Sequence, residues 1–381
     1  MRIALTTNFS PWSPYSGGGQ RSTHQLASAL AMRGHEVTVV YTRAPFDRIV
    51  EPDNLPYQVR WAAFFGARSS RQAPFRPLNA ISVRREIESL FAEKRLDVVH
   101  CQGEEGALIP RLRSRLDFSL VVTPRYPWYP THLKPNGDLL SLARLWVFDA
   151  KYPVLGKLIH GADWVCPTST SAAHGVQGAY GVSESKIRVI PNGINERFWN
   201  VRWDDLSHRD EVLFYGRLAH DKGVDVLLKA LRPTQLNLHV IGRGDQEIAL
   251  KDLARRLGVS QRVRWTDWCD PETLADEVAS SSLVVLPSRH ESFGNVMAET
   301  LAIGTPLIST NTGSIPEVVG PYAELINVDD VEGLTTAMTH VHAHSDEVKA
   351  RAAEGREWVR SRYHWDEVAA RFEEVYAVSR V

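Results

Sequence analysis

The sequence has little cysteine and no long hydrophobic run. Its three cysteines, Cys101, Cys166 and Cys269, are far apart and odd in number, which excludes a disulfide framework and a Cys-x-x-Cys metal pair. No apolar stretch approaches the roughly 18–20 residues that span a bilayer. The N-terminal residues MRIALTTNF lack the apolar core and the cleavage site of a signal peptide. We therefore expect a cytoplasmic protein.

The sequence also has no excess of charge of either sign, since it contains 44 basic and 45 acidic side chains. The near-neutral net charge and the absence of a nucleic-acid-binding motif argue against a nucleic-acid partner. The first 200 residues are nevertheless basic and the remainder acidic. Such asymmetry indicates either an anionic partner for the first half or two differently solvated surfaces.

What the sequence does contain is a repeating order of short apolar runs and helical patterns. This order predicts parallel sheets with helices on both faces. A helix is expected at Gln20–Arg33, where Leu26 and Leu30 share a stripe and Gly34 follows as a stop signal, and another pattern surrounds Leu108–Leu116. The strands expected in this first series are Arg2–Thr6, Glu36–Tyr41, Val98–Val99, Leu120–Thr123, Asp163–Pro167 and Ile187–Ile190.

The alternation restarts after Asn195–Asp210, a segment without periodicity that we interpret as a linker. Asp366–Val378 forms a final amphipathic helical pattern. We predict two doubly wound, Rossmann-like domains that face each other across a cleft, with ligands at the carboxyl ends of the strands. The second series comprises strands at Glu211–Tyr215, Asn237–Ile241, Arg262–Trp265, Leu283–Leu286 and Pro306–Ser309, with helices at Val224–Leu231 and Glu247–Leu257.

The segment Leu286–Val319 carries the strongest chemical signal. Its strand is followed by a polar loop with Glu291, and a helix that begins near Asn295 carries Glu299. Gly294 leaves room for a ligand to approach the free amides of the helix N-terminus, which favour anions. Two carboxylates beside an anion site are suited to a molecule with phosphates and hydroxyl groups.

Two other loops follow strands. Gly216 leads into Arg217 and Lys222, two cations that could neutralise a diphosphate leaving group or form surface salt bridges. Ser16–Gln20 (SGGGQ) precedes a helix and offers backbone amides to a phosphate or substrate, but its spacing is not the Gly-x-Gly-x-x-Gly fingerprint of NAD binding.

Together these residues resemble glycosyltransferase family 4, whose members are retaining enzymes with the GT-B fold. The most specific features are the E-x7-E spacing from Glu291 to Glu299 and the GRLxxxKG pattern from Gly216 to Gly223. The resemblance covers nearly the whole chain. Its further pieces are Val189–Asn195, Val240–Gly244, Ala162–Ser169 and the late helix after His364–Trp365.

The resemblance implies an N-terminal acceptor-binding domain at 1–194, a C-terminal nucleotide-sugar-binding domain at 195–363 and a helix at 364–381 that packs back on the first domain. It implies transfer of a sugar from a UDP- or GDP-sugar to a hydroxyl of a glycan, a lipid-linked molecule or a small molecule. Neither a metal nor another cofactor is expected, because cations and a helix dipole supply the positive charge.

The same resemblance assigns roles to residues. Arg217 and Lys222 would hold the diphosphate, Glu299 the ribose hydroxyls, and Glu291 the transferred sugar; Arg217, Lys222 and Glu291 are the expected catalytic residues. The donor site as a whole is expected to comprise Gly18, Gly19, Gly216, Arg217, Lys222, Gly242, Glu291, Ser292, Phe293, Gly294, Asn295 and Glu299.

The acceptor side departs from the family pattern. Many members have a histidine after the strand equivalent to Leu120–Thr123, where this sequence has Arg125, and a second common histidine is replaced by Gln102 in HCQGE. Glu104 and Arg125 are the expected acceptor-side residues. Whether Arg125 replaces the usual histidine in function is open at this point.

The basic, aromatic-rich segment Arg60–Arg85 suggests an anionic partner. It would suit a membrane surface at the inner face, a lipid-linked phosphate or an acidic sugar, or it is a solvated loop whose aromatic rings pack inward. Its residues include Arg60, Trp61, Phe64, Phe65, Arg68, Arg71, Phe75, Arg76, Arg84 and Arg85, with no acidic residue.

Other activities remain as alternatives. A nucleotide-sugar epimerase or a phosphorylase could use the same fold, and an inactive binding scaffold could keep it without catalysis. His340, His342 and His344 lie close in sequence, but only His340 and His344 would share a helix face. We interpret them as a solvated helix end and expect no metal site.

Overall fold

The computed structural model describes residues 1–13, 16–44, 47–65, 76–125, 154–203, 209–267, 269–343 and 345–378. The chain divides into two compact units. Unit 1 comprises Met1–Gly193 and Trp365–Val381, and unit 2 comprises Ile194–His364. In the described part of the chain, no helix combines the length and the hydrophobicity that crossing a membrane requires.

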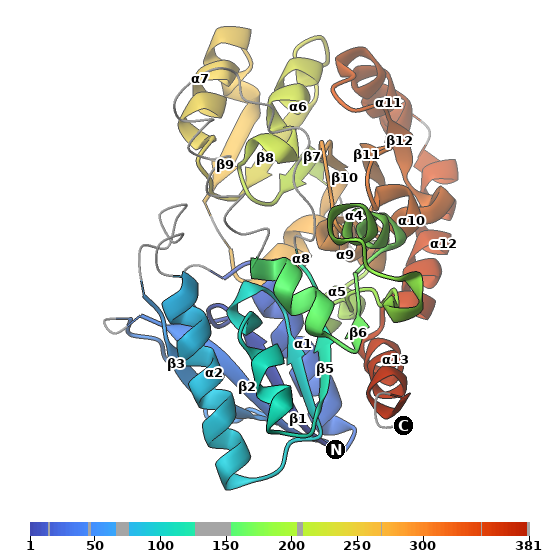
Figure 1. Cartoon of the computed structure of the whole chain (residues 1–381). Helices are drawn as coiled ribbons and strands as arrows, with labels where there is room; N and C mark the ends of the chain where they lie inside the picture. The colour runs from blue at the N-terminus through green and yellow to red at the C-terminus, as the bar shows by residue number, and fades with distance from the viewer. Residues whose placement is uncertain are drawn as a thin grey trace. The chain divides into compact units, whose positions relative to one another are not determined.

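Unit 1 is built on a six-stranded parallel sheet, which lies in the blue-to-green part of Figure 1. The strand order is β3-β2-β1-β4-β5-β6. The strands β2 and β3 are added on one side of β1, and β4, β5 and β6 are added on its other side. The strands are β1 (Arg2–Thr7), β2 (Glu36–Arg43), β3 (Gln58–Ala63), β4 (Val98–Cys101), β5 (Ser119–Val122) and β6 (Trp164–Val165).

Alternating side chains of these strands pack on opposite faces of the sheet. Ile3 and Leu5 belong to one core cluster with α1 (Gly18–Met32) and α13 (Trp365–Val378). Ala4 belongs to the other cluster, with α2 (Arg76–Glu93). Figure 1 shows the dark red α13 in the same unit as the blue and green elements, although it is the last helix of the chain.

Shorter helices complete unit 1. Ser169 caps one of them, because its hydroxyl accepts a hydrogen bond from the amide of Ala172 at 3.0 Å. These helices are η2 (Glu104–Gly106), η3 (Ile109–Ser114), α4 (Thr170–Tyr180) and η4 (Glu184–Lys186).

Unit 2 contains a second six-stranded parallel sheet with the order β12-β11-β10-β7-β8-β9. The strands are β7 (Arg209–Tyr215), β8 (Asn237–Ile241), β9 (Val263–Thr266), β10 (Ser281–Leu286), β11 (Leu307–Thr310) and β12 (Glu324–Ile326). The strands pack with the helices of this unit into one hydrophobic core.

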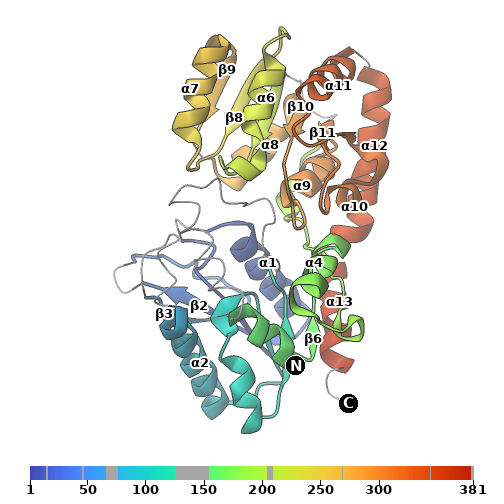
Figure 2. The ribbon, with the colours of Figure 1, turned by 45° about the horizontal axis from the view of Figure 1, so that its top comes forward.

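The helices of unit 2 surround this sheet, and Figure 2 shows α12 running beside α10 and α11. The α-helices are α5 (Glu196–Asn200), α6 (Val224–Leu231), α7 (Glu247–Leu257), α8 (Pro271–Ala279), α9 (Asn295–Ile303), α10 (Ile315–Val319), α11 (Val331–Ala343) and α12 (Ser345–Tyr363). The 3₁₀ helices are η6 (His220–Lys222), η7 (Ser260–Arg262) and η8 (Gly320–Tyr322).

The structure corrects three local predictions. Ile187–Ile190 is not a strand, because only Ile187 forms a bridge, with Val165. The pattern at Leu108–Leu116 folds as the 3₁₀ helix η3, which has Pro110 at its start. The segment expected to be a linker begins with α5 instead. Asn195 caps the N-terminus of this helix, because its side-chain oxygen accepts a hydrogen bond from the amide of Arg197 at 3.0 Å.

Candidate active site

The neighbouring strands β7 and β10 define the reversal point of the unit 2 sheet. From β7 the strand order continues to β8 and β9, whereas from β10 it continues the other way to β11 and β12. The loops that leave β7 and β10 therefore diverge, and open parallel sheets bind their ligands beyond the strand ends at such a point. The two loops carry Arg217 and Lys222 in one case and Glu291 in the other.

The β7–α6 loop presents two cations beside one carboxylate. The Arg217 guanidinium lies 3.0 Å from Asp221 Oδ2, and the Lys222 ammonium lies 3.7 Å from the same oxygen. Gly223 follows with φ +68°, and an added Cβ at that position would lie 2.0 Å from the carbonyl oxygen of Pro287. The glycine thus allows the two loops to lie in direct backbone contact.

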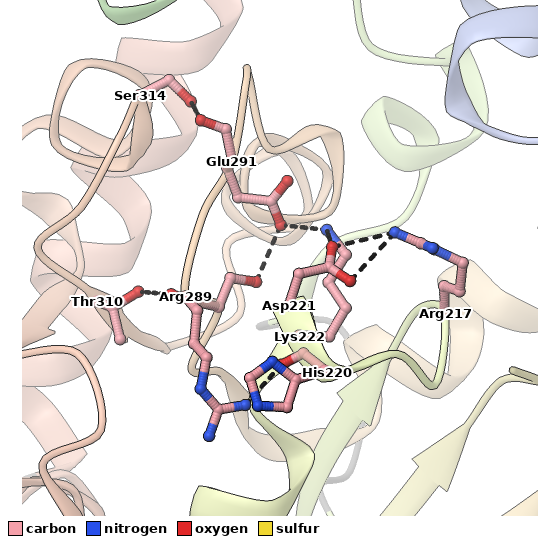
Figure 3. Close-up of polar contacts among 9 residues, drawn as sticks. Arg217, His220, Asp221, Lys222, Arg289, Glu291, Thr310 and Ser314 are labelled. Atoms are coloured by element: carbon pink, nitrogen blue, oxygen red, sulfur yellow. Dashed lines mark hydrogen bonds and ion pairs between the residues drawn. The ribbon is translucent and has the colours of Figure 1, made fainter. Parts of the chain in front are cut away.

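The β10–α9 loop presents Glu291 to Lys222. The Lys222 ammonium donates to Glu291 Oε1 at 2.6 Å, and the Ser288 hydroxyl donates to the same oxygen at 2.9 Å (Figure 3). The side chains of Lys222 and Glu291 are only 18% and 11% exposed. A charge pair in such a poorly solvated position is stronger than one on the open surface.

Two hydroxyl groups, one from β11 and one from the residue that precedes α10, fix the backbone of this loop. Ser314 Oγ donates to the carbonyl oxygen of Glu291 at 3.1 Å, and Thr310 Oγ1 donates to the carbonyl oxygen of Ser288 (Figure 3). The Glu291 carboxylate is therefore held through its main chain as well as through its partners. Sequence reasoning missed both hydroxyls, because they belong to segments some 20 residues further along the chain.

The N-terminus of α9 adjoins this loop. Gly294, with φ +87°, precedes the helix, and Glu299 lies in its second turn, half-buried. Tyr215 at the end of β7 donates its hydroxyl to the carbonyl oxygen of Val296 at 2.6 Å. Burial, together with the nearby charge of Glu299, raises the pKa of Tyr215 well above its ordinary value, so this phenol stays neutral and anchors the helix.

The other expected donor residues of unit 2 fall into three groups. Gly216 and Gly242 are in backbone contact, since an added Cβ on Gly242 would lie 1.8 Å from the carbonyl oxygen of Gly216. Phe293 directs its ring into the core, 5.3 Å from the ring of Tyr363, so only its backbone can serve a ligand. Ser292 and Asn295 are half-buried at the entrance of α9.

In unit 1, Gly18 and Gly19 form the first turn of α1, after β1. The amide of Gly17 donates to Gln20 Oε1 at 3.0 Å, which fixes this end of the helix. A Cβ added to Gly19 would lie 3.6 Å from Cγ of Arg125. The glycine turn, which is expected at the donor, and Arg125, which is expected on the acceptor side, are thus adjacent.

Arg125 is held by two amide oxygens. It donates to Gln102 Oε1 and to Asn192 Oδ1, each at 2.6 Å. Because Gln102 turns its oxygen to the guanidinium, its NH₂ group faces Nε2 of His100 at 3.2 Å, and His100 Nδ1 lies 2.8 Å from the hydroxyl of Tyr376. This polarity places the imidazole proton on Nδ1. Burial lowers the pKa of His100 to about 3, so the ring is neutral.

The carboxylate of this network is Glu105. It accepts hydrogen bonds from the Thr6 hydroxyl at 3.0 Å and from the amide of Gln102 at 3.2 Å. Burial first, and then the charge of Glu104, raise the pKa of Glu105 to about 7. Glu104, the residue expected on the acceptor side, is half-buried, while its neighbour Glu105 is fully buried.

Comparisons with known proteins agree with this geometry. The family model described as "Glycosyltransferase Family 4" matches residues 16–198, and the model described as "Glycosyl transferases group 1" matches residues 200–358. The chain belongs to glycosyltransferase family 4. The predicted fold class is likewise confirmed, since both units are doubly wound and the structural neighbours are GT-B glycosyltransferases.

Individual relatives align with nearly the whole length of this glycosyltransferase. A D-inositol 3-phosphate glycosyltransferase from Xylanimonas cellulosilytica is 28% identical, over 96% of this chain and 93% of its own. The structure of a sucrose-phosphate synthase from Thermosynechococcus elongatus has a TM-score of 0.85 at 20% identity, covering 99% and 98% of the two chains. The structure of Anabaena HepE in complex with UDP-glucose has a TM-score of 0.73 at 18% identity, covering 99% of this chain and 100% of its own.

The basic segment of the glycosyltransferase is not one solvated loop. Its first part is β3, in which Arg60 pairs with Glu93 of α2. Its last part lies in α2, in which Arg84 lies 3.7 Å from Glu88. Phe64 is buried, with its ring 4.7 Å from that of Phe9. Arg68, Arg71 and Phe75, on which the membrane prediction also depends, lie outside the described residues.

The histidine cluster of the sequence begins in α11. Across the described ranges, no group of three or more His, Cys, Asp or Glu side chains is placed to hold a metal ion. His340 lies in α11, whereas His344 is outside the described residues.

Proposed function

We propose that this glycosyltransferase moves a sugar from a nucleoside diphosphate sugar to an acceptor hydroxyl, with retention of the anomeric configuration and without a metal ion. The observation that carries the proposal is the contact between Lys222 and Glu291 at the reversal point of the unit 2 sheet, with Arg217 beside it. One loop offers cations to a diphosphate and the other offers a carboxylate to sugar hydroxyls.

Arg217 and Lys222 would supply the positive charge that the reaction needs. Breaking the bond from the sugar to the diphosphate develops negative charge on the leaving group, and positioned cations stabilise that charge. Arg217 and Lys222 are balanced by Asp221 and Glu291, so a bound diphosphate would replace these carboxylates as the partner of the two cations. Glu291 would then be released to accept hydrogen bonds from the sugar.

The α9 N-terminus adds a second source of positive potential. Backbone amides at the start of a helix point toward an anion and favour it. Gly294 and Asn295 stand at this end, and Glu299, one turn further on, would accept hydrogen bonds from the ribose hydroxyls. HepE, a structural neighbour, is described in complex with UDP-glucose, which supports a nucleotide sugar as donor here.

For the acceptor we propose an anionic molecule, bound in unit 1. Arg125 presents its Nε in a buried position, without a hydrogen-bond partner among the residues that the structure describes. One relative is named for D-inositol 3-phosphate, an acceptor with a phosphate group. Contact of the basic segment with an anionic membrane stays a prediction.

A panel of UDP- and GDP-sugars, assayed for slow hydrolysis, tests the donor without knowledge of the acceptor. Release of nucleoside diphosphate from one donor is expected, and Arg217→Ala, Lys222→Ala and Glu291→Ala should each reduce it on the order of 10²–10³-fold. Arg255→Ala is the matched control, because it removes a cation from an exposed ion pair on α7. Wild-type-like rates in all three site variants would refute the assignment.

The same preparation separates the alternatives. Calorimetry with UDP and GDP should show binding, and no binding of either would favour a scaffold. Conversion of the donor sugar without an acceptor would indicate an epimerase. The anomeric configuration of a product, read by NMR, tests retention.

A further inference from the structure

Arg289 lies in the β10–α9 loop between Ser288 and Glu291, yet its side chain does not join the donor site. Figure 3 shows the guanidinium directed toward His220 and away from the Glu291 carboxylate. The guanidinium is paired with two carboxylates, Asp225 and Asp329, so its charge is already compensated. It is therefore poorly suited to hold a diphosphate itself.

Its contacts instead join three segments of unit 2. Two of its nitrogens donate to the two oxygens of Asp225, at 2.8 and 2.9 Å, in the first turn of α6. Its Nε donates to Asp329 Oδ1 at 2.7 Å, in the turn between β12 and α11. Asp329 has φ +61°, a left-handed backbone that costs a non-glycine residue free energy, and this contact holds it there.

The contacts that matter most for the site are those with the residues just before Lys222. Arg289 Nη1 donates to the carbonyl oxygen of His220 at 2.5 Å. Its own amide donates to the carbonyl oxygen of Asp221 at 2.8 Å. The side chain and the main chain of Arg289 thus bind the carbonyl groups of His220 and Asp221, which directly precede Lys222. The position of the ammonium relative to Glu291 is set through this link.

The bidentate pair requires an arginine. Its planar fork reaches both oxygens of Asp225 and still leaves donors for His220 and Asp329, whereas a lysine ammonium is a single point charge. Burial pushes the pKa of Asp225 upward, but the bonds from Arg289 outweigh this and hold that pKa below its ordinary value. Asp225 therefore remains ionised, and the link is intact over the neutral pH range.

We propose that Arg289 is a positioning residue for donor binding: it ties the β7–α6 loop to the β10–α9 loop and thereby fixes Lys222 for contact with the donor diphosphate. This inference rests on the proposed function, in which Lys222 binds that diphosphate. Arg289 acts through Lys222 and does not touch the donor.

A double-mutant cycle on nucleotide binding tests it. The variants are Arg289→Lys, Lys222→Ala and their combination, and the measurement is the Kd for UDP and GDP by calorimetry, with Tm recorded for each variant. Arg289→Lys should weaken binding about tenfold in the wild-type background, as the loss of about 1.4 kcal/mol would do. In the Lys222→Ala background the same change should have almost no further effect, because the residue through which it acts is gone.

A merely structural role would give a different pattern. Arg289→Lys would then lower Tm and leave the Kd unchanged, or it would weaken binding by the same factor in both backgrounds; either result overturns the inference. Arg264→Lys is the matched control, because Arg264 also pairs with two carboxylates of unit 2, Glu211 and Glu277. It should lower Tm without changing the Kd.

Three further outcomes are informative. If Arg289→Lys does not fold, Asp225→Asn, which keeps the shape of the partner and removes its charge, is read in the same cycle with the same expectation. If wild type binds UDP or GDP and Lys222→Ala weakens binding while Arg289→Lys does not, this inference fails and the proposed function stands. If neither nucleotide binds to wild type, the proposed function fails and the inference fails with it.

Discussion

The buried carboxyl group of Glu105 should make the stability of unit 1 depend on pH in an unusual direction. Its side chain is almost fully buried, and its pKa is raised from 4.5 to about 7, chiefly by burial and then by the charge of Glu104. Between these two pH values the folded protein binds more protons than the unfolded chain. The free energy of unfolding therefore falls as the pH rises through this window.

The size of the effect follows from the two pKa values. A difference of one pKa unit corresponds to 1.36 kcal/mol, so a pKa raised from 4.5 to about 7 makes the ionised form cost about 3 kcal/mol of stability. Glu105→Gln keeps an oxygen for the bonds from Thr6 and Gln102 and cannot ionise. Relative to wild type, the variant should gain about 3 kcal/mol on going from pH 4.5 to pH 8.

The assay is the Tm of both proteins across this pH range. In a unit of this size the gain should appear as a relative shift on the order of 5–10 °C. The comparison cancels any fixed cost of the amide, because only the change with pH is read. Glu184→Gln, an exposed carboxylate of the same unit, is the control and should show no such trend. A difference between Glu105→Gln and wild type that stays constant with pH would refute the reasoning.

Three other predictions concern the backbone, the buried network and the metal. Gly223→Ala should destabilise unit 2 by more than about 2 kcal/mol, because it adds a clash with Pro287 to the cost of a left-handed alanine; Gly258→Ala, at φ +73° but in open space, should cost only about 1 kcal/mol in the same denaturant titration. Tyr376→Phe should lower the free energy of unfolding by about 1–3 kcal/mol, since it removes the partner of His100 in a buried site, and an unchanged midpoint would contradict this hydrogen bond. Donor hydrolysis should proceed equally with EDTA and with added Mg²⁺, and a strict need for the metal would overturn the metal-independent proposal.

The sequence by itself determined the two parallel sheets and indicated the candidate site residues. Alternating strand and helix patterns are local, because a strand buried on both faces needs an apolar run and a helix needs its stripe. The strands and helices with strong patterns, such as Glu36–Tyr41 and Val224–Leu231, therefore match β2 and α6 closely. The strand β12 is too short, and β3 too exposed, to show such an apolar run, and the sheet edge to which they pair makes them strands.

The site shows the same division. Arg217, Lys222 and Glu291 could be chosen from sequence, because they follow strand ends in loops with glycine and a helix start. Their supports could not: Arg289, Thr310 and Ser314 act through backbone carbonyls of residues distant in the chain, and a carbonyl carries no side-chain signature.

Unit 1 gives the second example. Glu104 and Glu105 are equivalent in sequence, yet the 3₁₀ turn of η2 buries Glu105 and leaves Glu104 half-exposed. The buried one joins Thr6 and Gln102, and burial raises its pKa to about 7. Residue type and spacing follow from the sequence, whereas desolvation and the choice of hydrogen-bond partners depend on the packing of segments that meet only in the folded chain.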